Sequence, residues 1–89
     1  MKAVITVAGK DAVGIIAGVS AICASCGANI VEITQSVLSE YFAMIMLADI
    51  SNLSVGFPAF SDRLTAFAGE QGLSIHAMHE DIFNTMHHV

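Results

Sequence analysis

The pattern of apolar and polar positions along the chain begins with a strand and a helix. Residues 3–8, AVITVA, form a short β-branched run that ends at Gly9, which predicts a strand. Residues 14–26 then predict a helix, because their apolar side chains recur at the three- and four-residue spacing of one helix face. Asp11 is expected at the N-cap of this helix, and Gly27 just beyond its C-terminus. The apolar positions of the helix are 15, 16, 19, 22, 23 and 26.

Two further strands follow at once. Residues 28–38, ANIVEITQSVL, and residues 41–50, YFAMIMLADI, are separated only by Ser39 and Glu40, which predicts a hairpin. In the second of these strands both faces are apolar: one face carries Phe42, Met44 and Met46, and the other carries Ala43, Ile45 and Leu47. A sheet with one wet face should alternate cleanly between apolar and polar residues. The face away from the helices is therefore expected to pack on something: the tail, another dimer or a partner protein.

The second half of the chain repeats the helix and strand. Pro58 suits a first helical turn, and Phe60, Leu64 and Phe67 continue one helix face until Gly72 ends it. Residues 73–82 predict the last strand, and residues 83–89 form a tail to which no structure is assigned. The order β-α-β-β-α-β, with two right-handed crossovers, predicts a single α+β domain over residues 1–89. We expect a ferredoxin-like sandwich, in which a four-stranded antiparallel sheet carries two helices on one face.

Residues 12–31 contain no charged side chain, which is unusual for a surface helix. One interpretation is a well-packed helix with a plain surface, and another is a contact between subunits along this helix and strand 28–38. A long apolar edge strand would otherwise invite aggregation, and pairing with its own copy would cover it. The outer face is expected to consist of small residues: Ala17, Gly18, Ser20, Ala21, Ala24 and Ser25.

Composition favours the second interpretation. Apolar residues make up 55% of the 89 residues and charged residues 12%, against about 25% charged in an average globular protein. This excess predicts burial against a partner, most simply a second copy. No apolar stretch approaches the roughly 20 residues that a membrane span needs. A net charge of −5 makes nucleic acid a poor partner, and the absence of a signal-peptide pattern after Met1 leads us to expect a cytoplasmic protein.

The turn before the first helix suggests a ligand site. A helix N-terminus attracts a carboxylate, Lys10 adds positive charge, and Asp11 can accept hydrogen bonds from an ammonium group. A free amino acid carries both groups. The alternative is that Asp11 only caps the helix and Lys10 is only solvated.

The segment KDAVGIIAGVS, followed by NIVEITQ fifteen residues after Gly14 and later by QGLSI, resembles the ACT domain, a small ligand-binding regulatory module. In that family a D-x-x-G-[IL]-[IL] turn opens the first helix and an N-I segment begins the second strand. The resemblance covers residues 2–82. It is strongest to stand-alone members made of one ACT domain, and looser to regulators of the glycine-cleavage type.

The resemblance implies a side-by-side homodimer with an eight-stranded sheet and an amino acid bound between the subunits. Asp11 and Gly14 would belong to the ligand turn, with Lys10 and Val13 beside them; many members carry proline where this chain has Val13. Asn29, with Ile30 next to it, would reach the ligand from the other subunit. Alternatively, Asn29 only bonds to the turn after the first helix. No attached catalytic domain is expected, so the signal would pass to another protein.

Other chemistry is less well supported. Cys23 and Cys26 form a C-x-x-C in the last helical turn, where the helix dipole opposes a thiolate, so core cysteines are expected rather than a redox pair. His76 and His79 should point to opposite faces of a strand, and Glu80 and Asp81 likewise.

The remaining histidines, His87 and His88, lie in the tail. No metal, cofactor or catalytic group is expected, and we interpret the chain as non-enzymatic. The alternatives left open are an assembly module that binds a partner protein without any ligand, and a metal or redox module.

Overall fold

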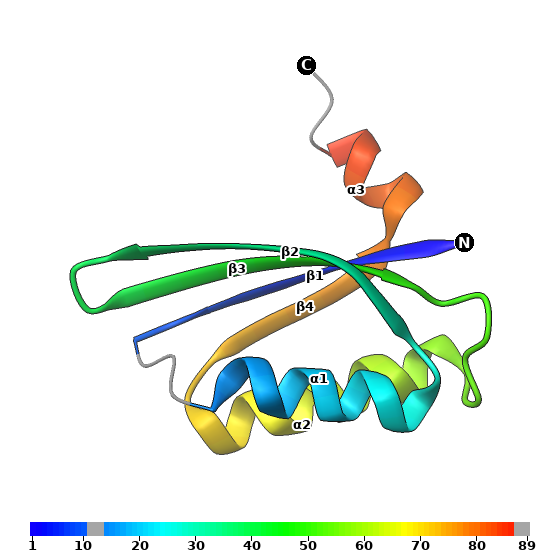
Figure 1. The fold of residues 1–89 in the computed structure, drawn as a ribbon, viewed down its shortest axis with the longest axis horizontal. Helices are drawn as coiled ribbons and strands as arrows, with labels where there is room; N and C mark the ends of the chain where they lie inside the picture. The colour runs from blue at the N-terminus through cyan, green and yellow to red at the C-terminus, as the bar shows by residue number, and fades with distance from the viewer. Residues whose placement is uncertain (11–13, 87–89) are drawn as a thin grey trace.

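The computed structural model describes residues 1–10 and 14–86. A four-stranded antiparallel sheet has the strand order β2-β3-β1-β4, so β2 and β4 form its edges. Helices α1 and α2 cover one face, and α3 stands on the other (Figure 1). The predicted ferredoxin-like sandwich is confirmed. The elements are β1 (Lys2–Gly9), α1 (Ile15–Cys26), β2 (Asn29–Leu38), β3 (Tyr41–Asp49), α2 (Phe57–Gln71), β4 (Ser74–His79) and α3 (Glu80–Met86).

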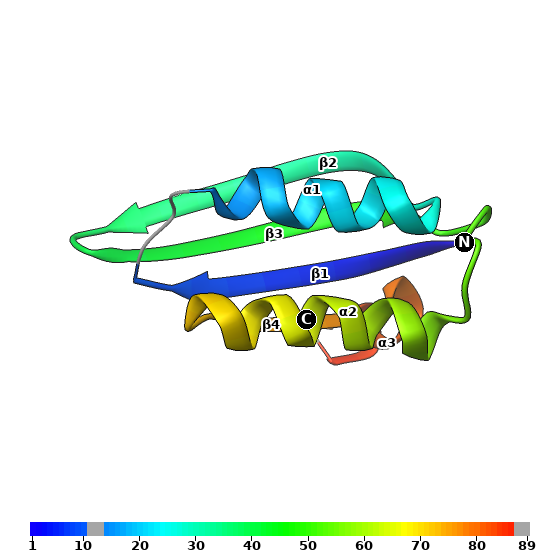
Figure 2. The same ribbon diagram turned by 90° about the horizontal axis from the view of Figure 1, so that it is seen from below.

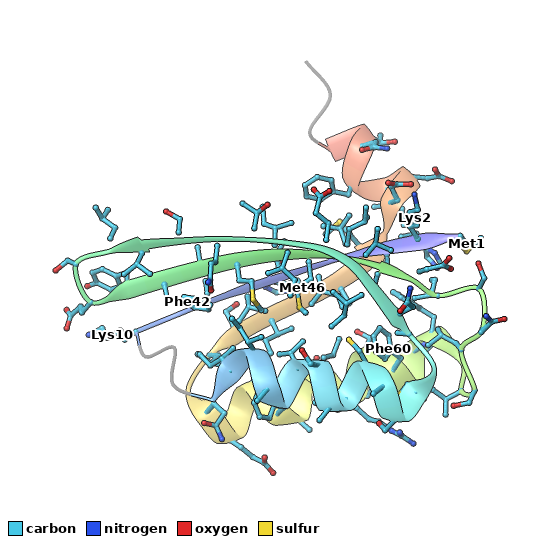
Figure 3. All side chains as sticks on the ribbon, viewed as in Figure 1. Met1, Lys2, Lys10, Phe42, Met46 and Phe60 are labelled. Atoms are coloured by element: carbon cyan, nitrogen blue, oxygen red, sulfur yellow. The ribbon has the colours of Figure 1, made fainter. Side chains whose placement is uncertain are left out.

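The core lies between the sheet and the two long helices. Phe42, Met44 and Met46 share one face of β3, as predicted, and the structure shows that this is the buried helix face, while Ala43 and Ile45 are exposed on the other face. Phe60 of α2 is 0% exposed and points towards the sheet (Figure 3). Seen from below, α1 lies along the β2 side of the sheet and α2 along the β4 side (Figure 2). This arrangement makes α1 and β2 one long flank of the molecule.

Glycine sets the ends of α1. Gly27 is its C-cap with φ 81°, as predicted, and the N–H of Ala28 donates to the Cys23 carbonyl oxygen at 2.8 Å. The N-cap is Gly14 with φ 75°, so the prediction that Asp11 caps the helix is wrong. Glycine adopts this left-handed conformation without the steric cost that a side chain would bring, and it allows the chain to turn directly into Ile15. Asp11 itself lies outside the described residues.

The outer face of α1 differs from the prediction at one residue. Gly18 faces inwards, and an added Cβ there would collide with the ring of Phe67 on α2. Placing Gly18 on the outer face was therefore wrong, because the missing side chain is what allows the two helices to approach closely. Ala17, Ala21 and Ala24 are exposed as predicted.

The C-terminal part of the chain also differs. Strand β4 ends at His79, and residues 80–86 form α3, so the predicted strand to residue 82 is wrong. Glu80 and Asp81 occupy the first turn of α3, where the helix dipole favours acidic side chains. Helix α3 packs on β1 and β4 and leaves the β2–β3 side of this face uncovered (Figure 1). Within the described residues, no helix is both long enough and apolar enough to cross a membrane.

Candidate functional site

The predicted ligand turn joins the end of β1 to the start of α1. Gly14 is exposed and carries no side chain that could cap the first helical turn, and its carbonyl oxygen accepts the N–H of Gly18 at 2.9 Å. Lys10 is exposed on the opposite side of the turn. Asp11 and Val13, the other predicted members, lie outside the described residues. Of the predicted set, the structure therefore describes Lys10 and Gly14 at this turn.

Lys10 is oriented by an aromatic ring. Its Nζ lies 5.8 Å from the ring centroid of Tyr41, the first residue of β3, within the range of a cation–π interaction. Figure 3 shows the Lys10 side chain extending from the end of β1 towards the β2–β3 hairpin. The positive charge at the end of β1 is thus directed at the hairpin.

A pocket of about 690 Å³ opens between the end of β1 and the β2–β3 hairpin. Its volume is within the range of about 300–1,000 Å³ that is usual for small-molecule sites. Among the described residues that line it, Lys10 is the only charged one, and most of the others are apolar. We call this the hairpin pocket. It is lined by Ala8, Gly9, Lys10, Ser36, Leu38, Tyr41, Phe42, Ala43 and Gly72.

The sequence reasoning missed the hairpin side of this pocket. Leu38 and Tyr41 line the same pocket as Lys10 only because β3 lies between β1 and β2, with Gly9 directly opposite Phe42. One signal in the sequence could have found them: the two large apolar residues Leu38 and Tyr41 flank the Ser39–Glu40 turn, and a hairpin end is usually polar. In the structure their side chains are 77% and 52% exposed.

Asn29 and Ile30 lie at the other end of the sheet. Asn29 is exposed and opposite Asp49, which is in turn opposite Lys2. The 12 residues of α1 separate Asn29 from Gly14 by about 18 Å along the helix axis. One protomer therefore does not bring Asn29 to the ligand turn. Ile30 is half-buried against the core.

The flank formed by α1 and β2 is exposed and apolar. Every residue from 31 to 38 is exposed, and β2 is an edge strand as predicted. Ile33 and Val37 lie opposite the buried Met46 and Phe42, so both face the helix side of the sheet. We call this region the β2–α1 surface; its large exposed apolar residues are Ile16, Val31, Ile33, Val37 and Leu38. Such an edge is a template for pairing with another strand.

The C-x-x-C belongs to the core. Cys23 and Cys26 are both buried and both unpaired, and the Nη1 of Arg63 donates to the Cys26 Sγ at 3.2 Å. Burial, with a smaller effect from Cys26, raises the pKa of the Cys23 thiol to about 11. A thiol with this pKa remains protonated and weakly nucleophilic at neutral pH. This geometry favours the prediction of core cysteines over a redox pair.

The raised pKa predicts how stability depends on pH. The Cys23 pKa rises from 9.0 in the unfolded chain to about 11 in the folded one, so its contribution is complete below pH 9. This contribution is lost as the pH rises through 11. We expect the free energy of unfolding of the native protein to fall between pH 9 and 11 by more than that of Cys23→Ala, as measured by urea denaturation. Equal pH slopes for the two proteins would contradict the assignment.

The histidines of β4 point to opposite faces, as predicted. His76 lies opposite Thr6 and His79 opposite Ala3, and the His79 ring packs on Phe57 with centroids 4.4 Å apart. Among the residues that the structure describes, no three His, Cys, Asp or Glu side chains gather where they could hold a metal ion. His87 and His88 lie outside the described residues.

Known proteins resemble this chain over its whole length. A sequence model of the ACT domain matches residues 2–78. The UPF0237 protein of Clostridium perfringens is 47% identical over 89 residues, which is all of both chains. The structure is similar to that of an ACT domain protein from Streptococcus pneumoniae, with a TM-score of 0.80, 41% identity and 93% of each chain covered.

The same architecture occurs as part of a larger enzyme. A formyltetrahydrofolate deformylase from Pseudomonas syringae is similar to 88% of this chain, with a TM-score of 0.78 and 26% identity, but this similarity covers only 27% of the enzyme. The family model, the full-length relative and the shared fold agree with one another. The chain therefore belongs to the ACT domain family.

Proposed function

We propose that this ACT-domain protein is a non-catalytic regulator that forms a homodimer and binds an amino acid between its two subunits. The observation that supports this most directly is the β2–α1 surface, an edge strand that is unpaired in the described protomer and exposes four large apolar side chains, those of Val31, Ile33, Val37 and Leu38. Leaving these large apolar side chains in water is unfavourable, and the chain has only three Lys and Arg residues to offset them. Pairing two copies along β2 would extend the sheet to eight strands.

The direction of β2 explains how two copies would complete one site. A two-fold axis near the middle of β2 pairs the strand antiparallel with its copy. The partner's Asn29, at the start of β2, then lies beside Leu38 at the end of this strand. Leu38 lines the hairpin pocket together with Lys10. The dimer would thus carry Asn29 across the interface to the end of β2 beside Lys10, which a single protomer cannot do.

The groups that meet in this dimer suit an amino acid. The Lys10 ammonium attracts the carboxylate, and the amide of Asn29 offers two N–H donors and one acceptor oxygen. The carboxylate of Asp11, whose position is not described, would accept hydrogen bonds from the ammonium group of the ligand. A ligand held by two subunits stabilises the dimer geometry that binds it, and that geometry is the signal passed to a partner protein. We propose that this occurs in the cytoplasm.

One observation favours a second candidate, an assembly module without any ligand. The uncovered side of the sheet has a shallow hollow of about 250 Å³, which is lined in part by Thr6, Ala43, Ile45 and His76. Ile45 is exposed there. In this alternative a partner protein packs on the uncovered face and the turn has no role in binding it.

Thermal shift with each of the twenty amino acids separates the two candidates. At a hundred times its dissociation constant, a bound ligand stabilises the protein by about 2.7 kcal/mol. We expect a shift with at least one amino acid, and about 10- to 100-fold weaker binding in Asn29→Ala, which removes the bridging amide. Asn84→Ala, in the exposed part of α3, is the matched control and should bind like the native protein. No shift with any amino acid would contradict the proposed function.

A further inference from the structure

We infer that Glu32 is a further binding residue: the partner subunit's Glu32 accepts the ammonium group of the amino acid held at the hairpin pocket. This inference rests on the proposed function, because it needs the homodimer that pairs through β2. It adds a residue that a single protomer cannot bring to its own pocket. Three features carry it: the sheet face on which Glu32 lies, its position in the paired strands and the complementary charge of the pocket.

Glu32 and the hairpin pocket lie on the same face of the sheet. Successive side chains of a strand point to opposite faces, and residues directly opposite each other on neighbouring strands share a face. Phe42 and Met46 of β3 are buried under α1 and α2, so the odd-numbered residues of β3 point to the other face, on which α3 stands (Figure 1). We call this the α3 face. Its β2–β3 pairs include Leu38 with Tyr41, Ser36 with Ala43 and Glu32 with Leu47.

Two-fold pairing of β2 places the partner's Glu32 at this pocket. A two-fold axis perpendicular to the sheet keeps every residue on its own face, so residues of the α3 face pair with one another. With the partner's Asn29 beside Leu38, the one-residue bulge at Val31 brings the partner's Glu32 opposite Ser36. Ser36 lines the hairpin pocket. Within one protomer Glu32 lies four residues before Ser36, about 13 Å along β2, so the partner's Glu32 is the nearer of the two.

The β2–α1 surface offers Glu32 no positive partner. Glu32 is the only charged residue of β2, and neither β2 nor α1 contains a lysine or an arginine. A carboxylate that loses water at an interface is costly unless a cation or a hydrogen-bond donor meets it. Pairing through β2 therefore leaves the partner's Glu32 in need of a positive group, and the ammonium group of the ligand supplies one.

Lys10 carries the opposite charge on the other side of the pocket. It is the only charged residue among the described residues of the lining, and its Nζ lies 5.8 Å from the ring centroid of Tyr41 (Figure 3). Three strand spacings, from the partner's β2 through β2 and β3 to β1, separate the two backbones by about 14 Å. A small ligand with two opposite charges fits between them over the apolar Leu38 and Ala43. Its carboxylate binds Lys10, and its ammonium group donates to the partner's Glu32.

Thermal shift with each of the twenty amino acids, on the native protein and on Glu32→Gln, tests this inference, and isothermal titration follows for any amino acid that shifts the native protein. We expect Glu32→Gln to bind that amino acid about ten-fold more weakly or worse, and Glu32→Asp to retain binding. Glu70→Gln removes the same charge from an exposed position on α2 and should bind like the native protein. The carboxylic acid that lacks only the amino group should bind the native protein and Glu32→Gln equally.

The outcomes separate this inference from the proposed function. If Glu32→Gln binds the amino acid as tightly as the native protein does, the inference is overturned and the amino-acid sensor stands. If no amino acid shifts the native protein, both are overturned. Light scattering on Glu32→Gln should give the mass of the native protein. A lower mass would show that Glu32 acts in pairing, and a higher mass that it guards the edge strand against aggregation, and either result overturns the inference.

Discussion

Replacing Val37 with lysine is expected to convert the proposed homodimer into monomers. Val37 is 68% exposed on the edge strand β2 and faces the helix side of the sheet. In a two-fold dimer the substitution occurs twice, and each lysine would have to lose water at the interface. We expect the dissociation constant of the dimer to rise at least 100-fold, which corresponds to about 2.7 kcal/mol. Size-exclusion chromatography with light scattering measures the change in mass.

A matched control separates this effect from a general loss of apolar surface. Ile82 is 51% exposed on α3, which lies on the other face of the sheet. Ile82→Lys should leave the mass unchanged. If the native protein is already a monomer at micromolar concentration, or if Ile82→Lys dissociates it as much as Val37→Lys, pairing through β2 is contradicted. In the proposed dimer Asn29 reaches the ligand only across this interface, so Val37→Lys should also weaken amino-acid binding.

Replacing Phe60 with alanine is expected to destabilise the fold more than any exposed substitution. Phe60 is 0% exposed and is the largest fully buried side chain among the described residues. Its removal leaves a cavity between α2 and the sheet, and such changes cost about 3–5 kcal/mol. Small domains have total stabilities near the lower end of about 5–15 kcal/mol. We expect the melting temperature to fall by about 15–30 °C.

Phe57→Ala is the comparison for this prediction. Phe57 lies one helical turn before Phe60 with ring centroids 6.2 Å apart, but it is only half-buried. Its loss should cost about 1–2 kcal/mol, because much of its surface is already in contact with water. Circular dichroism during urea unfolding, at one fixed protomer concentration, measures both variants. Equal losses for the two, or a loss below about 1 kcal/mol for Phe60→Ala, would contradict the assigned core.

The fold could be predicted because its signals are local. The alternation in residues 41–50 predicted a strand with Phe42, Met44 and Met46 on one face, and the glycines at 27 and 72 mark the ends of both long helices. These signals depend on neighbouring residues only. The boundary between β4 and α3 could not be predicted in this way, because no glycine or proline separates His79 from Glu80. Packing of α3 on β1 and β4 decides that boundary.

The candidate site was predicted only where its residues are contiguous. Lys10 and Gly14 lie in one segment between β1 and α1, and the sequence of that segment alone suggested a binding site for a carboxylate. Tyr41 contacts Lys10, and Leu38 lines the same pocket, an arrangement that depends on the order and register of β1, β2 and β3. Asn29 was assigned through resemblance to the ACT domain, and in one protomer it lies at the far end of α1 from the turn.

The sequence by itself determined the order of strands and long helices, the apolar character of α1 and β2, and the turn with its positive charge. These follow from the periods of helix and strand and from residue chemistry, which act over a few positions. Tertiary structure alone decided that Gly18 faces α2, that residues 80–86 turn back as a helix, and that Lys10 faces Tyr41. Each of these depends on which distant surfaces come into contact, and such contacts are fixed only when the whole sheet has formed.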